Sequence, residues 1–242
     1  MQHHAWELID DAAAAELESD LWWLSGRRAI LSRFLRLAAL PPGASILEIG
    51  CGSGGDLDLL ARFGDVTGVE PSPILANRAR RRHDVLQGTL ADVPARPFDL
   101  VCAFDVLEHL EDDRALVREV ASRARPGDQL LVTVPACPWL FGHHDRMLHH
   151  YRRYSRARLR SALEGFEIRR ISSFLFFLFP AAVVQRVFGS SKKEGVTLAR
   201  TPRPISEILE ATLRLEGALS EHVPLPIGLW LFALARRLPR LE

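Results

Sequence analysis

Short apolar runs alternate with helical stretches along most of the chain. The apolar runs are rich in Val, Ile, Leu and Phe, and the stretches between them repeat apolar side chains at helical spacing. Strands that are apolar throughout and separated by helices are typical of parallel sheets with both faces covered. The pattern therefore predicts a doubly wound α/β fold. The predicted strands are 46–49, 66–69, 85–86, 100–104 and 130–134, and the helices between them are 56–63, 73–82 and 112–124.

Further segments flank this core on both sides. Residues 5–20 and 27–40 have helical periodicity, and the second stretch stops at two prolines and a glycine. A strand predicted at 166–173 precedes a long, mostly helical stretch and an apolar segment at 227–234. We expect three parts, which are an N-terminal helical lid at 1–42, a core at 43–174 and 224–242, and a helical insert at 175–223 before the last strand.

The composition is that of an ordinary globular protein. The 242 residues are 48% hydrophobic and 25% charged, and the formal net charge is +1. These values argue against disordered and polybasic chains, so we expect no nucleic-acid partner. The three cysteines form no CxxC pair, and the N-terminus lacks the basic-then-apolar layout of a signal peptide. We therefore expect a cytoplasmic protein.

The longest apolar run is FLFFLFPAAVV at 174–184. It is shorter than the roughly 20 residues that cross a bilayer, and Pro180 interrupts it, so we expect no transmembrane segment. The insert that contains it has three candidate roles, which we rank in order. It would complete an apolar acceptor pocket, form a dimer interface, or contact a membrane surface.

A glycine-rich turn follows the first predicted strand. The string ILEIGCGSGGD at 46–56 passes through Gly50, Gly52 and Gly55 into a helix, a geometry that lets the backbone approach a ligand above a helix N-terminus. Glu70 stands twenty residues after Gly50, at the end of the next strand, where a carboxylate can accept both ribose hydroxyls. These features predict a nucleotide-type cofactor and, taken alone, also fit a nicotinamide-dependent oxidoreductase.

Two further features distinguish between these cofactors. Glu48 precedes the glycines within the strand, and its carboxylate suits a cofactor with an ammonium group better than one with a pyrophosphate. The fourth strand ends in FDLVCAFDVLEHLEDD at 98–113. With the glycine turn and Glu70, this set resembles class I S-adenosylmethionine-dependent methyltransferases. The resemblance implies a Rossmann-like fold of that class, S-adenosylmethionine as cofactor and S-adenosylhomocysteine as product.

Two more segments resemble a bacterial subfamily of these enzymes. ESDLWWLSGRR at 18–28 is similar to its Trp-rich N-terminal helix, with Leu21 where that group usually has His. PACPWLFGHHDRMLHHYRRYSRARL at 135–159 is similar to the loop after its fifth strand, with Phe141 in place of Trp and His149 in place of Gly. The residues that match the loop pattern are His144, Asp145, His150, Arg152, Arg153 and Tyr154.

The resemblance implies specific contacts with the cofactor. At its methionine and ribose portion, Gly50, Cys51 and Gly52 would line the site, and Glu48 would hold the amino group. The remaining implied contacts are Phe104 beside the methionine chain, Arg27 or Arg28 at the carboxylate, Glu70 at the ribose hydroxyls, Pro71 and Ser72 beside adenine, and Thr89 and Leu90 as further adenine neighbours, with Asp92 as the alternative.

Methyl transfer from a sulfonium is an in-line displacement, favoured when nucleophile and methyl are held about 3 to 3.5 Å apart in a site closed to water. A base is needed only for a protic nucleophile, and His suits this role near neutral pH. His144 with Asp145 is the preferred base, and the alternatives are a solvated loop and catalysis by proximity alone. We expect His109 to be a structural hydrogen-bond partner. No HExxH-like spacing occurs, so we expect no metal.

The acceptor side is less well specified. Trp23, His150, Arg153 and Tyr154 are its candidate contacts, and Trp22 and Trp23 would either cover the site or pack against the sheet. The arginines at 146–160 indicate either an anionic acceptor or a solvated helix that begins after Ser155. We predict methyl transfer to a small-molecule acceptor, with oxygen as the expected atom. The alternative is a non-catalytic cofactor-binding or scaffold protein of the same fold.

Overall fold

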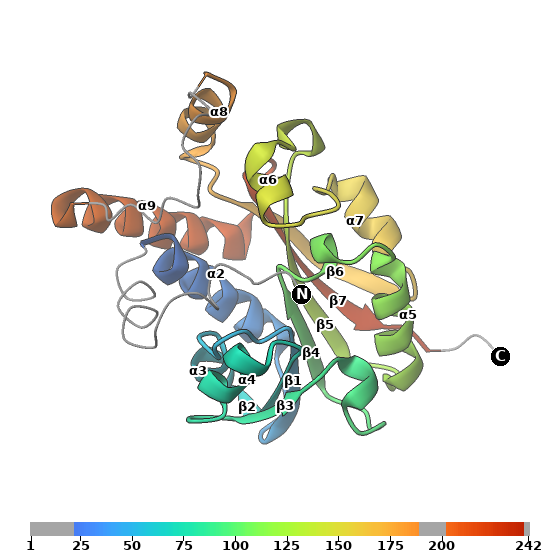
Figure 1. Ribbon diagram of the computed structural model, residues 1–242. Helices are drawn as coiled ribbons and strands as arrows, with labels where there is room; N and C mark the ends of the chain where they lie inside the picture. The colour runs from blue at the N-terminus through green and yellow to red at the C-terminus, as the bar shows by residue number, and fades with distance from the viewer. Residues whose placement is uncertain (1–21, 189–201, 240–242) are drawn as a thin grey trace.

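The protein is a helix-covered mixed sheet of seven strands, seen in a computed structural model that describes residues 22–188 and 202–239 (Figure 1). The strand order is β3-β2-β1-β4-β5-β7-β6. Strands β1 to β5 pair in parallel, whereas β7 is antiparallel to both β5 and β6. The strands are β1 (Ala44–Ile49), β2 (Gly64–Glu70), β3 (Asp84–Gln87), β4 (Leu100–Phe104), β5 (Gln129–Pro135), β6 (Phe166–Phe174) and β7 (Trp230–Arg237).

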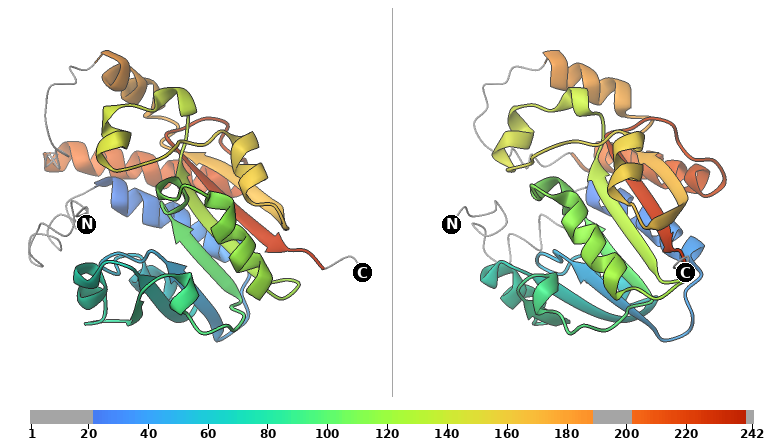
Figure 2. Two further views of the ribbon diagram at one scale, coloured as in Figure 1. Left: turned by 45° about the vertical axis from the view of Figure 1, so that its right-hand side comes forward. Right: turned by 90° about the vertical axis from the view of Figure 1, so that its right-hand side faces the viewer.

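Helices cover both faces of this sheet, as the two turned views also show (Figure 2). Apolar side chains of α5 and α7 pack on one face, and those of α2, α3, α4 and α9 pack on the other. The α-helices of the described residues are α2 (Trp22–Ala38), α3 (Leu57–Leu60), α4 (Pro73–Ala79), α5 (Asp113–Arg123), α6 (His143–Met147), α7 (Arg156–Ala162), α8 (Phe179–Phe188) and α9 (Arg203–His222). The described residues also form the short 3₁₀ helices η2 (Leu90–Asp92), η3 (Leu107–His109) and η4 (Pro138–Leu140).

The predicted α/β class and all seven predicted strands are confirmed, but several element bounds differ. The helix predicted at 27–40 begins at Trp22, and the helix predicted at 56–63 is the short α3. The last strand was predicted at 227–234 and runs instead from Trp230 to Arg237. Its bounds follow from pairing with β5 and β6 on both sides, which apolar composition does not reveal. The helix predicted at 5–20 lies outside the described residues.

The described part of the proposed lid is a core helix. Ile30, Leu31 and Phe34 of α2 are fully buried against the sheet. Helix α9, from the predicted insert, lies beside α2 and buries Leu213 in the same cluster (Figure 1). Both helices therefore form part of one core with the sheet. None of the helices in the described ranges combines the length and apolar composition that a bilayer crossing requires.

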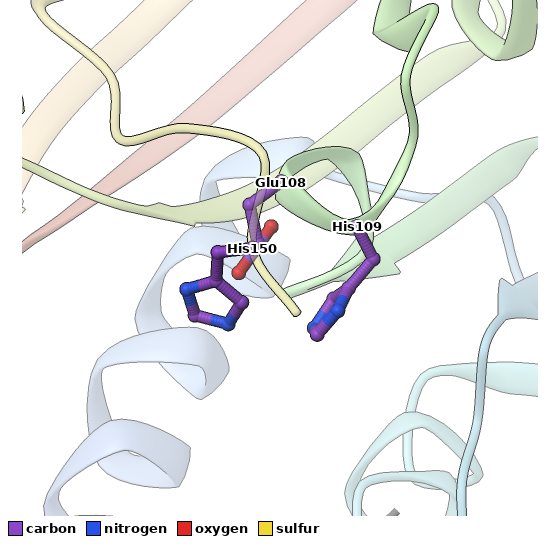
Figure 3. A group of neighbouring side chains, drawn as sticks. All are labelled: Glu108, His109 and His150. Atoms are coloured by element: carbon purple, nitrogen blue, oxygen red, sulfur yellow. The ribbon is translucent and has the colours of Figure 1, made fainter. Parts of the chain in front are cut away.

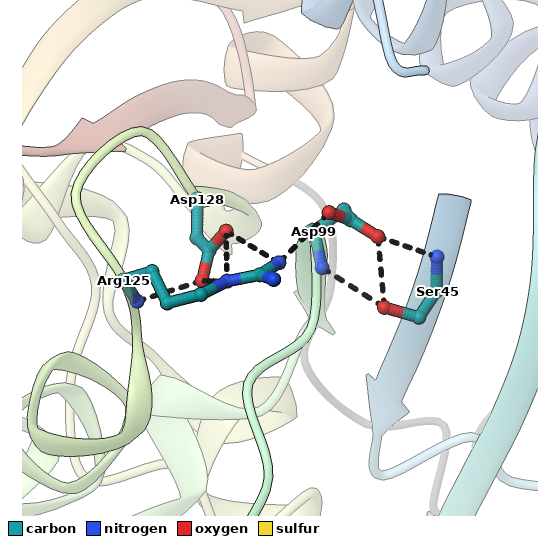
Figure 4. A network of polar contacts seen from close by, with 4 residues as sticks. All are labelled: Ser45, Asp99, Arg125 and Asp128. Carbon is teal, nitrogen blue, oxygen red and sulfur yellow. Dashed lines mark hydrogen bonds and ion pairs between the residues drawn. The ribbon is translucent and has the colours of Figure 1, made fainter. Parts of the chain in front are cut away.

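A polar network joins the amino ends of β1, β4 and β5, at the edge of the sheet opposite the glycine turn (Figure 4). Asp99 accepts hydrogen bonds from Ser45 N at 2.8 Å, Ser45 Oγ at 2.9 Å and Arg125 Nη2 at 2.9 Å. Asp128 accepts from the Arg125 backbone N–H at 2.7 Å. Partial burial opposes ionisation of Asp99, but the bonds from Ser45 and the charge of Arg125 lower its pKa.

The Asp99→Ala substitution is expected to reduce the free energy of unfolding by about 1 to 3 kcal/mol, because it removes the acceptor of these bonds. Since the pKa of Asp99 is lowered by folding, its stabilising effect is present above the ordinary Asp pKa of about 4 and is lost as the pH falls through the folded value. Urea denaturation between neutral and acidic pH measures both effects. The exposed Asp84→Ala control should change little, and an equal loss in both variants would contradict the network's role.

Candidate functional site

The turn after β1 has the backbone geometry that close ligand approach requires. Gly50 and Gly52 have φ values of +69° and +56°, a left-handed region that favours glycine. A Cβ on Gly50 would lie 2.8 Å from Val106 Cγ2, so the turn packs directly against the segment after β4. A Cβ on Gly52 would meet nothing within 4 Å among the described residues. The Gly52 backbone is therefore open to a ligand.

Glu70 holds the glycine turn and the next loop together. Its Oε2 accepts from Gly52 N at 2.9 Å, and its Oε1 accepts from Ser72 N at 2.9 Å. Ser72 is itself the N-cap of α4, where its hydroxyl accepts from Leu75 N. Pro71, between them, is exposed. The structure thus brings Gly52, Glu70, Pro71 and Ser72 together at the carboxyl ends of β1 and β2, and their cofactor contacts stay predictions.

Glu48 is a buried carboxylate on the face of the sheet that α2 covers. Its Oε2 is buried and has no hydrogen-bond partner among the described residues. Burial, and next the charge of Asp56, raise the pKa of Glu48 well above its ordinary value, whereas Arg27 lowers it. A buried carboxylate oxygen without a donor is costly, and an ammonium group would satisfy it. The residues present therefore fit a cofactor that carries an amino group.

Arg27 is buried beside Glu48 but contacts two carboxylates of the protein itself. It pairs with Asp56 after the glycine turn and with Asp105 after β4, and its guanidinium carbon lies 5.8 Å from the centroid of the Phe104 ring. The role predicted for Arg27, binding the cofactor carboxylate, stays a prediction. Sequence reasoning missed Asp56 and Asp105. In the structure Asp105 has a φ of +55°, which is unusual for a residue other than glycine and is common at functional sites.

The remaining predicted cofactor residues contact mainly protein. The Cys51 side chain is buried, and its sulfur would lie 2.7 Å from a Cβ on Gly68 of β2, so only its backbone can line the turn. Thr89 donates from N and Oγ1 to Asp92 Oδ2, at 2.8 and 3.1 Å, and these bonds lower the pKa of Asp92. The Leu90 side chain belongs to the hydrophobic core. Its predicted adenine contact would therefore have to come from the backbone.

In the loop after β5, Asp145 is the central polar group. It is fully buried and accepts from Gly142 N at 2.9 Å, Arg153 Nε at 2.7 Å and His150 Nδ1 at 3.3 Å. Arg153 is also buried and donates from Nη1 to the Ala136 carbonyl at 3.1 Å. His144 is exposed on α6. The geometry therefore favours His150 over the predicted His144 as the imidazole that Asp145 orients.

Two of the predicted acceptor contacts pack against the protein. Tyr154 has no exposed surface, and its hydroxyl donates to Asp113 Oδ2 at 2.7 Å, so its side chain is not accessible to an acceptor in this structure and the acceptor contact stays a prediction. The Trp23 ring stacks on Trp230 at the start of β7, with 6.2 Å between ring centroids and 15° between planes. This is the packing alternative for Trp23, and its role as a cover stays a prediction.

Part of the arginine run also makes internal contacts, whereas Arg146, Arg158 and Arg160 are exposed. Arg152 pairs with Asp113 at 3.1 Å and donates to the Glu111 carbonyl at 2.6 Å. Arg156, just after the confirmed Ser155 N-cap, donates to the Ile171 and Leu225 carbonyls. These bonds fasten the loop to its neighbours, so they weaken the case for an anionic acceptor bound by this run.

A family model described as a methyltransferase domain matches residues 22–172, which is more than half of the chain. The chain belongs to the methyltransferase domain family. The match begins at Trp22 and so includes α2 with the core. It confirms the resemblance to class I S-adenosylmethionine-dependent methyltransferases, and S-adenosylmethionine is the cofactor of this family. The resemblance to the bacterial subfamily stays a prediction. The result favours a methyltransferase over the nicotinamide-dependent oxidoreductase.

Curated relatives match part of this methyltransferase-family chain. A ubiquinone biosynthesis O-methyltransferase of Xanthomonas axonopodis pv. citri is 34% identical over 105 residues, covering 38% of this chain and 44% of the relative. A probable S-adenosylmethionine-dependent methyltransferase of Mycolicibacterium smegmatis is 32% identical over 162 residues, covering 63% of this chain and 62% of the relative. The chain therefore spans less than two thirds of the length of these relatives.

Solved methyltransferase structures share the fold over nearly the whole chain. The methyltransferase in complex with the Trm112 activator of Haloferax volcanii has a TM-score of 0.61 at 19% identity, covering 96% of this chain and 97% of that one. The plantazolicin methyltransferase BpumL, solved with S-adenosylhomocysteine, has a TM-score of 0.57 at 14% identity, covering 97% and 93%. These likenesses confirm the Rossmann-like methyltransferase fold.

Proposed function

We propose that the protein transfers the methyl group of S-adenosylmethionine to an oxygen of a small-molecule acceptor. The observation that carries the cofactor assignment is the buried Glu48 carboxylate, whose Oε2 lacks a hydrogen-bond partner among the described residues. It lies on the strand that leads into the open Gly52 backbone. Oxygen as the acceptor atom is supported by the relatives named ubiquinone biosynthesis O-methyltransferase.

The chain's own residues would bind and orient both reactants. Glu48 would accept from the cofactor ammonium, Glu70 would accept from the ribose hydroxyls, and the Gly52 turn would leave room for the methionine chain. The bound cofactor supplies an activated methyl group on a sulfonium. The acceptor hydroxyl would lose its proton to solvent, and its oxygen would form the new C–O bond as the C–S bond breaks, with that bond's electron pair staying on the sulfur of S-adenosylhomocysteine. Much of the rate would then come from alignment of the reactants.

The acceptor is proposed to be apolar rather than anionic. The exposed Trp139 of η4 meets Phe179 of α8 with ring centroids 6.3 Å apart, so the insert contacts the loop after β5 through aromatic groups. This contact supports the first of the roles ranked for the insert, an apolar acceptor pocket. Dimer formation, membrane-surface contact and a cytoplasmic location stay predictions.

Calorimetry with S-adenosylhomocysteine, followed by transfer of labelled methyl to a panel of phenols and catechols, tests the proposal. We expect saturable binding of S-adenosylhomocysteine, none of NAD, and a labelled methyl ether. Binding of NAD but not of S-adenosylhomocysteine would refute the cofactor assignment. Cofactor binding without transfer to any acceptor, in the panel or in cell extract, would favour the non-catalytic alternative.

A further inference from the structure

Three potential metal ligands converge where β4 and β5 end. Glu108 and His109 lie in η3, directly after β4, and His150 lies in the loop that follows β5 and α6 (Figure 3). One ligand atom from each residue lies within 4.8 Å of the others. The two imidazole rings are nearly perpendicular, at 87°, with centroids 4.6 Å apart. A single ion can therefore be reached from all three side chains.

Glu108 supplies an observation independent of this clustering. Its side chain is 1% exposed, and its Oε2 is buried without a hydrogen-bond partner among the described residues. Burial, and next the charge of Asp105, raise the pKa of Glu108 well above its ordinary value. In Figure 3 the Glu108 carboxylate lies close to both imidazole rings. A buried carboxylate oxygen that lacks a donor is costly, and a cation between these groups would remove the cost.

One ring nitrogen of His150 contacts a carboxylate, as is usual for histidines that bind a metal through the other ring nitrogen. Its Nδ1 contacts the buried Asp145 carboxylate at 3.3 Å, which directs the Nε2 lone pair away from Asp145. Asp145 is in turn held by Gly142 N and Arg153 Nε. A carboxylate behind a histidine ligand fixes its tautomer and raises its basicity toward a metal. The buried Asp145–Arg153 pair would therefore orient the His150 imidazole toward the metal in addition to stabilising the loop.

We propose that Glu108, His109 and His150 bind a divalent transition-metal ion. Two imidazole nitrogens and one carboxylate oxygen favour ions such as Mn²⁺, Fe²⁺, Co²⁺ or Zn²⁺ over Mg²⁺ and Ca²⁺, which prefer oxygen ligands. Three protein ligands also leave coordination positions for water or substrate. This inference revises the expectation of no metal, which rested on the absence of HExxH-like spacing. The three ligands come from two loops that only the fold brings together.

The site is adjacent to the proposed cofactor turn. A Cβ on Gly50 would lie 2.8 Å from Val106, two residues before Glu108. If the proposed function holds, on which this step rests, the acceptor hydroxyl would bind the ion and have its pKa lowered. The hydroxyl would lose its proton to solvent, and its oxygen would then form the C–O bond as the C–S bond breaks toward sulfur. No side-chain base would be needed, which agrees with the exposed position of His144.

The test is metal binding by the full chain after dialysis against a chelator. Mn²⁺ titration followed by electron paramagnetic resonance, and Zn²⁺ titration by calorimetry, are expected to give one site per chain. Glu108→Gln, His109→Ala and His150→Ala should each weaken binding by about tenfold or more. His143→Ala, an exposed histidine of α6, is the matched control and should bind as the unmodified protein does. A variant with His3 and His4 replaced by Ala controls for metal bound at the N-terminus.

Binding of S-adenosylhomocysteine by the same variants separates the two proposals. The Glu108→Gln and His150→Ala variants should bind S-adenosylhomocysteine within about threefold of the unmodified protein, since both side chains are proposed to bind the metal on the acceptor side. Loss of metal binding with cofactor binding retained supports the site. Equal metal affinity in all three ligand variants and the unmodified protein, or no metal binding at all, overturns it even if S-adenosylhomocysteine binds. If the protein binds metal through these three residues but does not bind S-adenosylhomocysteine, the metal site stands and only the proposed function is refuted.

Discussion

Glu70→Ala is expected to weaken S-adenosylhomocysteine binding on the order of a hundredfold or more. We propose that the carboxylate accepts two charge-assisted hydrogen bonds from the ribose hydroxyls, each contributing about 1.5 to 3 kcal/mol. It also accepts from Gly52 N and Ser72 N at 2.9 Å each, so its removal releases the glycine turn and the start of α4. Calorimetry with S-adenosylhomocysteine measures the change in the dissociation constant.

Two further variants make this result specific. Asp65→Ala removes an exposed carboxylate from the start of the same strand and should leave the dissociation constant unchanged. Glu70→Gln keeps the shape and one acceptor oxygen and should give an intermediate loss. If Glu70→Ala folds and binds S-adenosylhomocysteine as tightly as the unmodified protein, the cofactor's ribose does not lie at the end of β2.

Arg153→Met is expected to lower the free energy of unfolding by about 3 to 5 kcal/mol, because it removes the buried guanidinium that pairs with the Asp145 carboxylate. Arg153 is 3% exposed and Asp145 is 0% exposed, so solvent cannot replace the lost partner. The substitution also removes a donor from the Ala136 carbonyl. Urea denaturation followed by circular dichroism measures the loss.

The comparison variants separate a structural role of Arg153 from acceptor binding. Arg160→Met, an exposed arginine of α7, should change stability by less than about 0.5 kcal/mol. The double variant Asp145→Asn with Arg153→Met should recover part of the loss, since the buried charge is then absent. A stable Arg153→Met protein with weakened acceptor binding would instead support the acceptor role predicted from the sequence.

Features that depend on neighbours along the chain were predictable from the sequence. The apolar runs identified β1 to β5 because a parallel sheet buries both faces of each strand. The Ser155 cap was also predicted, because capping depends on a side chain and an amide a few residues apart. The meeting of Glu70 with the glycine turn followed from the βαβ unit, in which β1 and β2 are adjacent and end at the same edge.

Contacts between segments that are distant in the sequence were decided only by the tertiary structure. Residue types suggested that His144 serves with Asp145, but the path of the loop after β5 buries Asp145 against His150 and Arg153. The burial of Tyr154 on Asp113 has the same origin. The order of strands places β4 next to β5, and this brings Glu108 and His109 to His150. The sequence by itself determined the family, the strands of the sheet and the glycine turn, because these follow from local periodicity and motif spacing. The partners of its charged side chains were set by packing between loops, which no spacing along the chain encodes.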